Sequence, residues 1–160
     1  MLYLQDCMKF NNKIEIKNRK ARFEYEIIDT YTAGIVLGGS EIKSIRLGKA
    51  SIAESFCEFQ NSELWVINMT VQEYSHASYY SHQPKQARKL LLNRKELKKL
   101  EKEVNSTGNT IIPLRMFITD KGFAKLDIAL AKGKKLFDKR ETLKDRDNKR
   151  KLDQIKKDYK

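Results

Sequence analysis

Apolar and acidic residues alternate over residues 23–27 of the chain, which predicts a strand with one buried and one solvated face. A second apolar run follows at residues 33–37 and is closed by a glycine pair. Ser40 can then cap a short helix, with Glu41 in its first turn, where an acidic side chain is favourable. Gly48 is placed to end that helix, because glycine readily takes the left-handed conformation of the residue after a C-cap. We therefore expect two strands followed by a short helix.

A hairpin is predicted in the middle of the chain, where residues 56–60 and 63–71 flank the turn residues Asn61 and Ser62. In the second arm, apolar residues alternate with polar ones. The residues expected to share its buried face are Trp65, Ile67, Met69 and Val71, opposite Asn68 and Thr70.

The clearest hairpin lies around residue 120. Two alternating runs surround a short polar turn, in which Gly122 can take the left-handed conformation that such a loop needs. The residues expected on the buried face are Ile112, Leu114, Met116 and Ile118 in the first arm, and Ala124, Leu126, Ile128 and Leu130 in the second.

A polar segment and a longer helix separate the two hairpins. Residues 72–87 lack periodicity and predict a loop. Asn93 can cap the helix, with Glu96 three residues later in a variant of the capping box. Five or six short antiparallel strands with two flanking helices predict a mainly β fold: an OB-like closed antiparallel barrel, with a β-sandwich as the alternative.

The last part of the chain differs in character. Residues 138–160 contain neither glycine nor proline, and several acidic and basic residues stand at i,i+4 spacing. Their few apolar residues form too thin a stripe to hold a helix against the barrel. We therefore expect a basic tail that is disordered in the free protein and becomes helical on a charged partner. The predicted division is an N-terminal extension at residues 1–17, the barrel at 18–132 and the tail at 133–160, with Met8 as a second candidate start.

Positive charge is concentrated in three blocks. The formal net charge is +12. Residues 132–160 hold 13 basic and 6 acidic residues, residues 84–104 hold 8 and 3, and residues 17–22 hold four basic residues and no acidic one. Charge this localised predicts contact patches for an anionic partner, either a nucleic acid or an anionic membrane.

A membrane is the weaker of these two partners. No apolar run approaches the roughly 20 residues needed to span a bilayer. The N-terminal stretch carries Asp6 and lacks a small-residue cleavage site. With Cys7 and Cys57 as its two cysteines, the chain is expected to lie in a reducing cytosol rather than to form a disulfide scaffold. We expect a cytoplasmic monomer that binds no membrane.

No catalytic or metal-binding pattern accompanies the charge. His76 and His82 lie in the polar segment, and neither cysteine stands at a zinc-ligand spacing from them. The chain also lacks a G-x-S-x-G nucleophile motif and a glycine-rich phosphate loop. Aromatic side chains of the segment instead precede Lys85 and Lys89, as unstacked bases and phosphates require. We expect a non-enzymatic RNA-binding protein without metal or cofactor; a ribosomal protein and an RNA-processing enzyme are the alternatives.

Six short blocks are distinctive when they are taken in order. They are Asn18–Arg22, Ala33–Leu37, Gly39–Ser44, Arg88–Asn93, Ala131–Lys135 and Asp138–Arg140. Each block alone is modest evidence, whereas the ordered set is highly specific. Over about residues 18–140, the chain resembles the SsrA-binding protein (SmpB) family.

The resemblance implies a bacterial cytoplasmic protein with an OB-like barrel and flanking helices. Members of this family bind transfer-messenger RNA (tmRNA, or SsrA RNA) through its tRNA-like domain and bring it to stalled ribosomes for trans-translation. The family's basic tail enters the vacant mRNA channel of the small subunit and becomes helical there. The partners implied for this chain are therefore tmRNA and the stalled ribosome.

By position, the resemblance assigns two groups of site residues. The RNA-binding group is Asn18, Arg19, Lys20, Arg22, Glu41, Lys43, Ser44, Lys89, Leu91 and Leu92. The ribosome-contacting tail group is Lys132, Gly133, Lys134, Lys135, Phe137, Asp138, Lys139, Arg140 and Ile155. Leu91 and Leu92 are equally compatible with a place in the core.

Three positions depart from the family's usual residues. Thr32 stands where many members have glutamate, Phe23 replaces a frequent histidine, and Phe137 replaces a histidine found in some members. An aromatic ring at residue 137 can still stack on a base, whereas the hydrogen bond of an imidazole is lost. The family resemblance therefore gives the least support for assigning site roles at these three positions.

Overall fold

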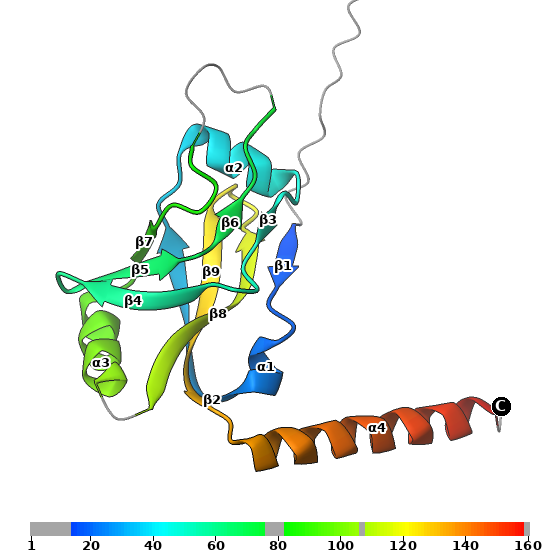
Figure 1. Ribbon diagram of the computed structural model, residues 1–160. Coiled ribbons are helices and arrows are strands. Elements are labelled where there is room, and N and C mark those ends of the chain that lie inside the picture. The colour runs from blue at the N-terminus through cyan, green and yellow to red at the C-terminus, as the bar shows by residue number, and fades with distance from the viewer. Residues whose placement is uncertain (1–13, 76–81, 106–107, 159–160) are drawn as a thin grey trace, which may run out of the picture.

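The computed structural model describes residues 14–75, 82–105 and 108–158 (Figure 1). In chain order its elements are β1 (Glu15–Lys17), α1 (Ala21–Glu24), β2 (Tyr25–Ile35), α2 (Gly39–Arg46), β3 (Ala50–Ser51), β4 (Phe56–Gln60), β5 (Glu63–Ile67), β6 (Thr70–Val71), β7 (Arg88–Leu91), α3 (Arg94–Val104), β8 (Asn109–Ile118), β9 (Ala124–Gly133) and α4 (Leu136–Asp158).

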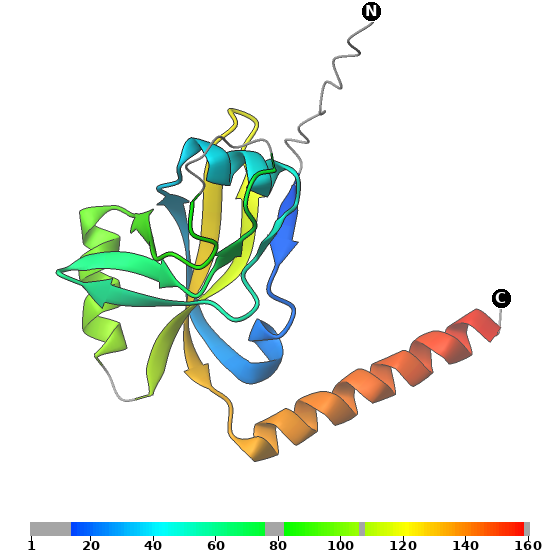
Figure 2. The ribbon, with the colours of Figure 1, turned by 45° about the horizontal axis from the view of Figure 1, so that its top comes forward.

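Six of the strands close into an antiparallel ring (Figure 2). In the order β8, β4, β5, β7, β2, β9, each strand is hydrogen-bonded to the next, and β9 pairs again with β8. The short strands β3 and β6 form a separate antiparallel pair. The expected closed antiparallel barrel is therefore confirmed, and the chain does not form the alternative sandwich.

Strand β1 extends the sheet along β8. Its three residues pair with Arg115 to Phe117, beyond the point where β4 pairs with β8 at Ile111. Residues 15–17, which the sequence placed in the N-terminal extension, thus lie in the barrel sheet. Three residues are too few for an alternation to be read from the sequence.

Strand β2 is a single strand of 11 residues, where the sequence indicated two shorter ones. Its polar middle, residues 29–32, interrupts the apolar pattern but remains paired with β9. The hydroxyl of Thr32 donates to Asp127 on β9 at 2.7 Å, so polar side chains on the outer face are bonded across the strands. The first predicted strand also starts too early, because Phe23 and Glu24 belong to α1.

Two changes of phase make the predicted buried faces correct only in part: Met69 and Val71 are buried as predicted, and so are Ile112, Met116 and Ile118. Asn68, at a φ of 63°, separates β5 from β6, so the buried side chains of β5 are Leu64 and Val66 rather than Trp65 and Ile67. The register of β8 shifts between Pro113 and Arg115. As a result, Ile112 and Leu114 pack in a different cluster from Met116 and Ile118. In β9 the predicted face is confirmed, since Ala124, Leu126, Ile128 and Leu130 all lie in the main core.

The main core fills the ring, and α2 and α3 pack on it from different sides (Figure 1). Ile45 of α2 and Leu100 of α3 are fully buried in this core. Helix α2 is capped at Gly38, two residues before the predicted cap Ser40, because the Glu41 carboxylate accepts the N–H of Gly38. Helix α3 starts as expected after Asn93, whose N–H donates to the Glu96 carboxylate at 3.0 Å. A smaller cluster, Ala21, Ile112, Ala129 and Ala131, fastens α1 to the outside of the barrel.

Helix α4 projects away from the barrel (Figures 1 and 2). It is held at its root, where the N–H of Lys134 donates to the carbonyl of Glu24 at 2.9 Å. Its apolar side chains remain exposed, and Phe137 is 74 % accessible. The thin apolar stripe accounts for this arrangement, because it gives the helix too little surface to bury. The tail is thus helical here, and its expected disorder in the free protein stays a prediction.

Candidate nucleic-acid interface

A groove of about 650 Å³ opens between the turn before α1 and strands β1, β2, β8 and β9. Three of the predicted RNA-binding residues line it, namely Asn18, Arg19 and Arg22. The Asn18 Oδ1 accepts the N–H of Ala21, the first residue of α1, at 3.2 Å, and its Nδ2 donates to the carbonyl of Pro113 at 3.1 Å. Asn18 therefore fixes the turn that carries Arg19 and the start of α1, which carries Arg22.

The acidic side chains that line the groove form ion pairs with basic side chains of the barrel. Arg115 donates to Asp127 at 2.7 Å and to Glu15 at 3.0 Å. The pKa of Glu15 is held below its ordinary value by the hydrogen bonds from Lys17 and Arg115. These contacts neutralise both carboxylates that line the groove.

The two arginines at the edge of the groove are not neutralised in this way. Arg19 and Arg22 are exposed, and within the described part of the chain neither guanidinium forms a hydrogen bond or an ion pair. Lys20, between them, is instead 3.2 Å from Glu54. The groove therefore presents a net positive charge, as a site for an anion requires.

A smaller hollow of about 350 Å³ continues the groove toward the tail. It shares Arg22, Thr30 and Leu114 with the larger one, and Lys134 lies at its border. Around the root of α4, Lys132, Gly133 and Lys135 are exposed. Two groups that lie far apart in the sequence, the residues before α1 and the start of the tail, thus form neighbouring surfaces.

Helix α2 carries three predicted RNA-binding residues, but the structure separates them. Lys43 is exposed, with its Nζ 5.5 Å from the centre of the Tyr74 ring. Glu41 and Ser44 are buried, so in this structure their side chains cannot touch a macromolecule. The resemblance placed all three together, because position in a motif does not distinguish a surface residue from an interior one.

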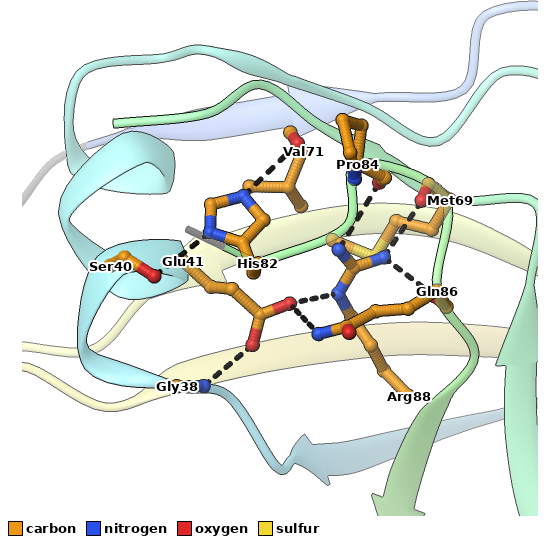
Figure 3. A network of polar contacts seen from close by, with 9 residues as sticks. All are labelled: Gly38, Ser40, Glu41, Met69, Val71, His82, Pro84, Gln86 and Arg88. Atoms are coloured by element: carbon orange, nitrogen blue, oxygen red, sulfur yellow. Dashed lines mark hydrogen bonds and ion pairs between the residues drawn. The ribbon is translucent and has the colours of Figure 1, made fainter. Parts of the chain in front are cut away.

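The Glu41 carboxylate is the centre of a polar network (Figure 3). It accepts hydrogen bonds from the N–H of Gly38, from Nε2 of Gln86 and from Nε of Arg88. Burial acts to raise the pKa of Glu41, but these three bonds outweigh it and hold the pKa below its ordinary value. Glu41 is therefore ionised inside the protein.

Strand β7 positions the next predicted group. Lys89 is half-buried and forms an ion pair with Glu63 of β5. Leu91 is 52 % exposed, whereas Leu92 is half-buried against the main core. The sequence left both a surface and a core position open for this leucine pair. In the structure Leu91 lies on the surface, and Leu92 lies on the core side.

The tail group begins in the last residues of β9 and in the segment after it, and continues along the exposed helix α4. Phe137, Asp138 and Arg140 are exposed in the first turns of α4, Lys139 is half-exposed, and Ile155 is 51 % exposed near its other end. His76 falls outside the described residues. Among the described residues there is no group of three or more potential metal ligands, and no described helix is long and apolar enough to cross a membrane.

Sequence reasoning missed the residues that shape these surfaces. Arg115 controls the charge of the groove through partners on β1 and β9, and Asp29 on β2 binds Lys99 on α3 at 2.8 Å. Alternation marks such residues as outward-facing. The alternation pattern does not indicate which residues, distant in the sequence, they contact.

The sequence profile of the SmpB protein family matches residues 15–158. The chain belongs to the SmpB family. It is 67 % identical to the SsrA-binding protein of Christiangramia forsetii over 154 residues, which are 96 % of this chain and 98 % of that protein. It is 55 % identical to the SsrA-binding protein of Agrobacterium fabrum over 136 residues, 85 % of each chain.

A solved structure described as "tmRNA-SmpB: a journey to the center of the bacterial ribosome" has the same fold. Its TM-score with this chain is 0.64 at 41 % sequence identity, and the match covers 79 % of this chain and 87 % of that one. The family resemblance and the barrel expected from the sequence are both confirmed.

Proposed function

We propose that this SmpB-family chain is a non-enzymatic RNA-binding adaptor of the bacterial cytoplasm. It binds tmRNA through the tRNA-like domain of that RNA and delivers it to stalled ribosomes for trans-translation. The names of its relatives and the subject of the related solved structure support both partners. The family assignment covers nearly the whole chain, so the barrel and the tail both belong to this function.

The observation that carries the proposal is the groove with Arg19 and Arg22 at its edge. Its carboxylates are neutralised by protein cations, while its two arginines are exposed and have no anionic partner among the described residues. Arginine binds phosphate with a fixed fork of N–H donors, and it also stacks on bases. An RNA backbone supplies the anion that this arrangement lacks.

The predicted RNA-binding group divides into two kinds of residue. Arg19, Lys20, Arg22, Lys43, Lys89 and Leu91 present accessible side chains, and we assign direct contacts to them. Asn18, Glu41, Ser44 and Leu92 shape the surfaces from below.

The tail contributes the ribosome contacts. The cations of residues 132–135 lie just before its exposed helix, which has Phe137, Lys139 and Arg140 near the barrel and Ile155 near the far end. A helix with so little packing against its own protein has its side chains available for rRNA in the mRNA channel. We assign the ribosome-contacting role to this group.

A reconstituted translation reaction on an mRNA without a stop codon tests the function. Addition of the chain together with tmRNA should release the stalled ribosome and tag the incomplete protein, and either component alone should not. A chain that stays on all ribosomes in stoichiometric amount through high-salt washing would instead be a constitutive ribosomal protein, contrary to the proposal.

A further inference from the structure

Two oppositely charged side chains lie inside the protein where α2 meets the start of β7 (Figure 3). Arg88 Nε donates to Glu41 Oε1 at 2.7 Å, and the residues are 2 % and 3 % exposed. Removing two charges from water is unfavourable, and apolar residues of similar volume often stabilise a fold as well or better. The pair therefore indicates a role other than stability alone.

The Arg88 guanidinium joins the returning end of the loop between β6 and β7 to Met69, the residue just before β6. Nη1 donates to the carbonyls of Met69 and Gln86, at 2.8 and 2.9 Å, and Nη2 donates to the carbonyl of Pro84 at 3.2 Å. The Pro84 carbonyl also accepts the N–H of Val71. An irregular segment has no strand partner for its carbonyls, whereas arginine offers five N–H donors in a fixed fork. Arg88 thus organises the base of this loop.

Glu41 attaches the loop to α2. Its Oε2 accepts the N–H of Gly38 at 2.6 Å, at the start of the helix. Its Oε1 accepts from Gln86 Nε2 at 2.7 Å as well as from Arg88. One carboxylate therefore joins the first turn of α2 to the returning end of the loop.

His82 makes a second connection between the same two parts. Its Nδ1 lies 2.9 Å from the Ser40 hydroxyl on α2, and its Nε2 lies 3.2 Å from the carbonyl of Val71 at the outgoing end of the loop. Both ends of the loop are thus bound to the first turn of the helix (Figure 3).

The docked loop completes a surface with a cation and an aromatic ring. Tyr74 comes three residues after Val71, and its ring centre is 5.5 Å from the Nζ of Lys43 on α2. Lysine and tyrosine side by side suit a phosphate and an unstacked base. The position of Lys43 depends on α2 and that of Tyr74 on the loop, so their distance depends on the docking.

We propose that Glu41 and Arg88 are positioning residues. By docking the loop on α2 they hold Lys43 and Tyr74 together as an RNA-contacting surface, and neither buried side chain touches the RNA. This inference rests on the proposed function. It explains why an RNA-binding motif contains the carboxylate of Glu41.

Electrostatics alone predicts the opposite effect for Glu41. A carboxylate near RNA repels phosphate, so its neutralisation would strengthen binding. Positioning predicts that the same change weakens binding. The sign of the effect of Glu41→Gln therefore separates the two accounts.

The experiment uses the full chain and the isolated tRNA-like domain of tmRNA as the probe. The variants are Glu41→Gln, Arg88→Met and the double variant, with Glu73→Gln as the control, since Glu73 is exposed on the same loop. Affinity is measured by titration, and amide exchange of residues 71–75 and 82–86 is measured in the free proteins. We expect the three network variants to bind at least about tenfold more weakly and to exchange faster. Glu73→Gln should bind as tightly as the unchanged chain, or more tightly.

The double variant guards against misfolding, because it leaves no unpaired buried charge. The double variant should unfold cooperatively. Its affinity for the RNA should be no lower than that of the weaker-binding single variant, because Glu41 and Arg88 act as one unit. Lys43→Ala should weaken the unchanged chain but not Arg88→Met, where the surface is already lost.

Three results would overturn the inference. They are tighter binding by Glu41→Gln, weakened binding with unchanged amide exchange of the loop, and a folded double variant with the affinity of the unchanged chain. Absence of binding by the unchanged chain would instead overturn the proposed function, so the two failures are distinguishable.

Discussion

The Nζ of Lys134 donates a hydrogen bond to the backbone carbonyl of Arg22 at 3.1 Å. Lys134 follows β9 and Arg22 lies in α1, so this bond joins the root of the tail to the edge of the groove. The two residues are 112 positions apart in the sequence. The tail therefore leaves the barrel beside the groove, and the two assigned RNA surfaces are continuous there.

The groove predicts how its arginines affect binding. Arg19→Ala and Arg22→Ala should each weaken binding of the tRNA-like domain about tenfold, the size expected when a hydrogen bond to a charged group is lost. Each should also reduce the slope of log affinity against log salt concentration by about one, the amount expected when one phosphate contact is lost. Titrations at several salt concentrations measure both quantities. Lys121→Ala, at the exposed tip of the β8–β9 hairpin, is the matched control and should change neither one.

The tail predicts a separation of functions. Deletion of residues 138–160 should leave RNA binding by the barrel largely intact, because this segment has its root beside the groove but does not line it. The same deletion should abolish tagging on stalled ribosomes. A filter-binding assay and a reconstituted tagging assay measure the two effects. A loss of RNA affinity as large as that of an Arg19/Lys20 double alanine variant would contradict the division.

Asn68 predicts a backbone effect on stability. Its φ of 63° lies in the left-handed region, which costs most residues about 1–2 kcal/mol but which asparagine and glycine tolerate. Asn68→Ala should therefore lower the free energy of unfolding by about 1 kcal/mol, and Asn68→Gly should lower it less. Chemical denaturation measures both. Equal losses in the two variants would show that the side chain, and not the backbone, is responsible.

Asp29 predicts a pH dependence of stability. Hydrogen bonds from Lys99, from Tyr31 and from the N–H of Thr30 lower its pKa from 3.8 to about 2. A carboxyl group whose pKa is lowered by folding stabilises the protein above its unfolded pKa, and this contribution is lost as pH falls toward 2. The unchanged chain should thus exceed Asp29→Asn in stability near neutral pH, by less than about 1 kcal/mol for so exposed a pair.

The check is a denaturant series between pH 2 and pH 7. The difference between the two proteins should shrink as the pH drops below about 4 and vanish near pH 2. In a Lys99→Met background, which removes the largest cause of the shift, the difference should be smaller at neutral pH. A difference that is constant over the whole series would contradict the assignment.

The parts of the fold that sequence reasoning predicted are those with an uninterrupted local period. Strand β9 keeps one alternation from Ala124 to Leu130, and its buried face was predicted correctly. In β5 and β8 the alternation changes phase, at Asn68 and between Pro113 and Arg115. A phase change depends on pairing with neighbouring strands, and a single run of residues does not reveal it.

The candidate site shows the same limit. The family blocks identified Arg19, Arg22 and Lys43 as candidate site residues, because charge and motif are local properties. The structure places all three side chains on accessible surfaces. They gave Glu41 the same role, although its side chain is buried. Its interior position depends on Arg88, 47 residues away. A contact at that separation is fixed by the tertiary fold, so the sequence alone indicated the residue but not what it does.

The most direct test of the central claim is the affinity of the full chain for the tRNA-like domain of tmRNA, compared with duplex DNA of similar length over a range of salt concentrations. We predict much tighter binding of the RNA at moderate salt, with an affinity that falls steeply as the salt concentration rises. Equal affinity for the two nucleic acids at moderate salt would contradict the account, because the basic surfaces would then attract any polyanion.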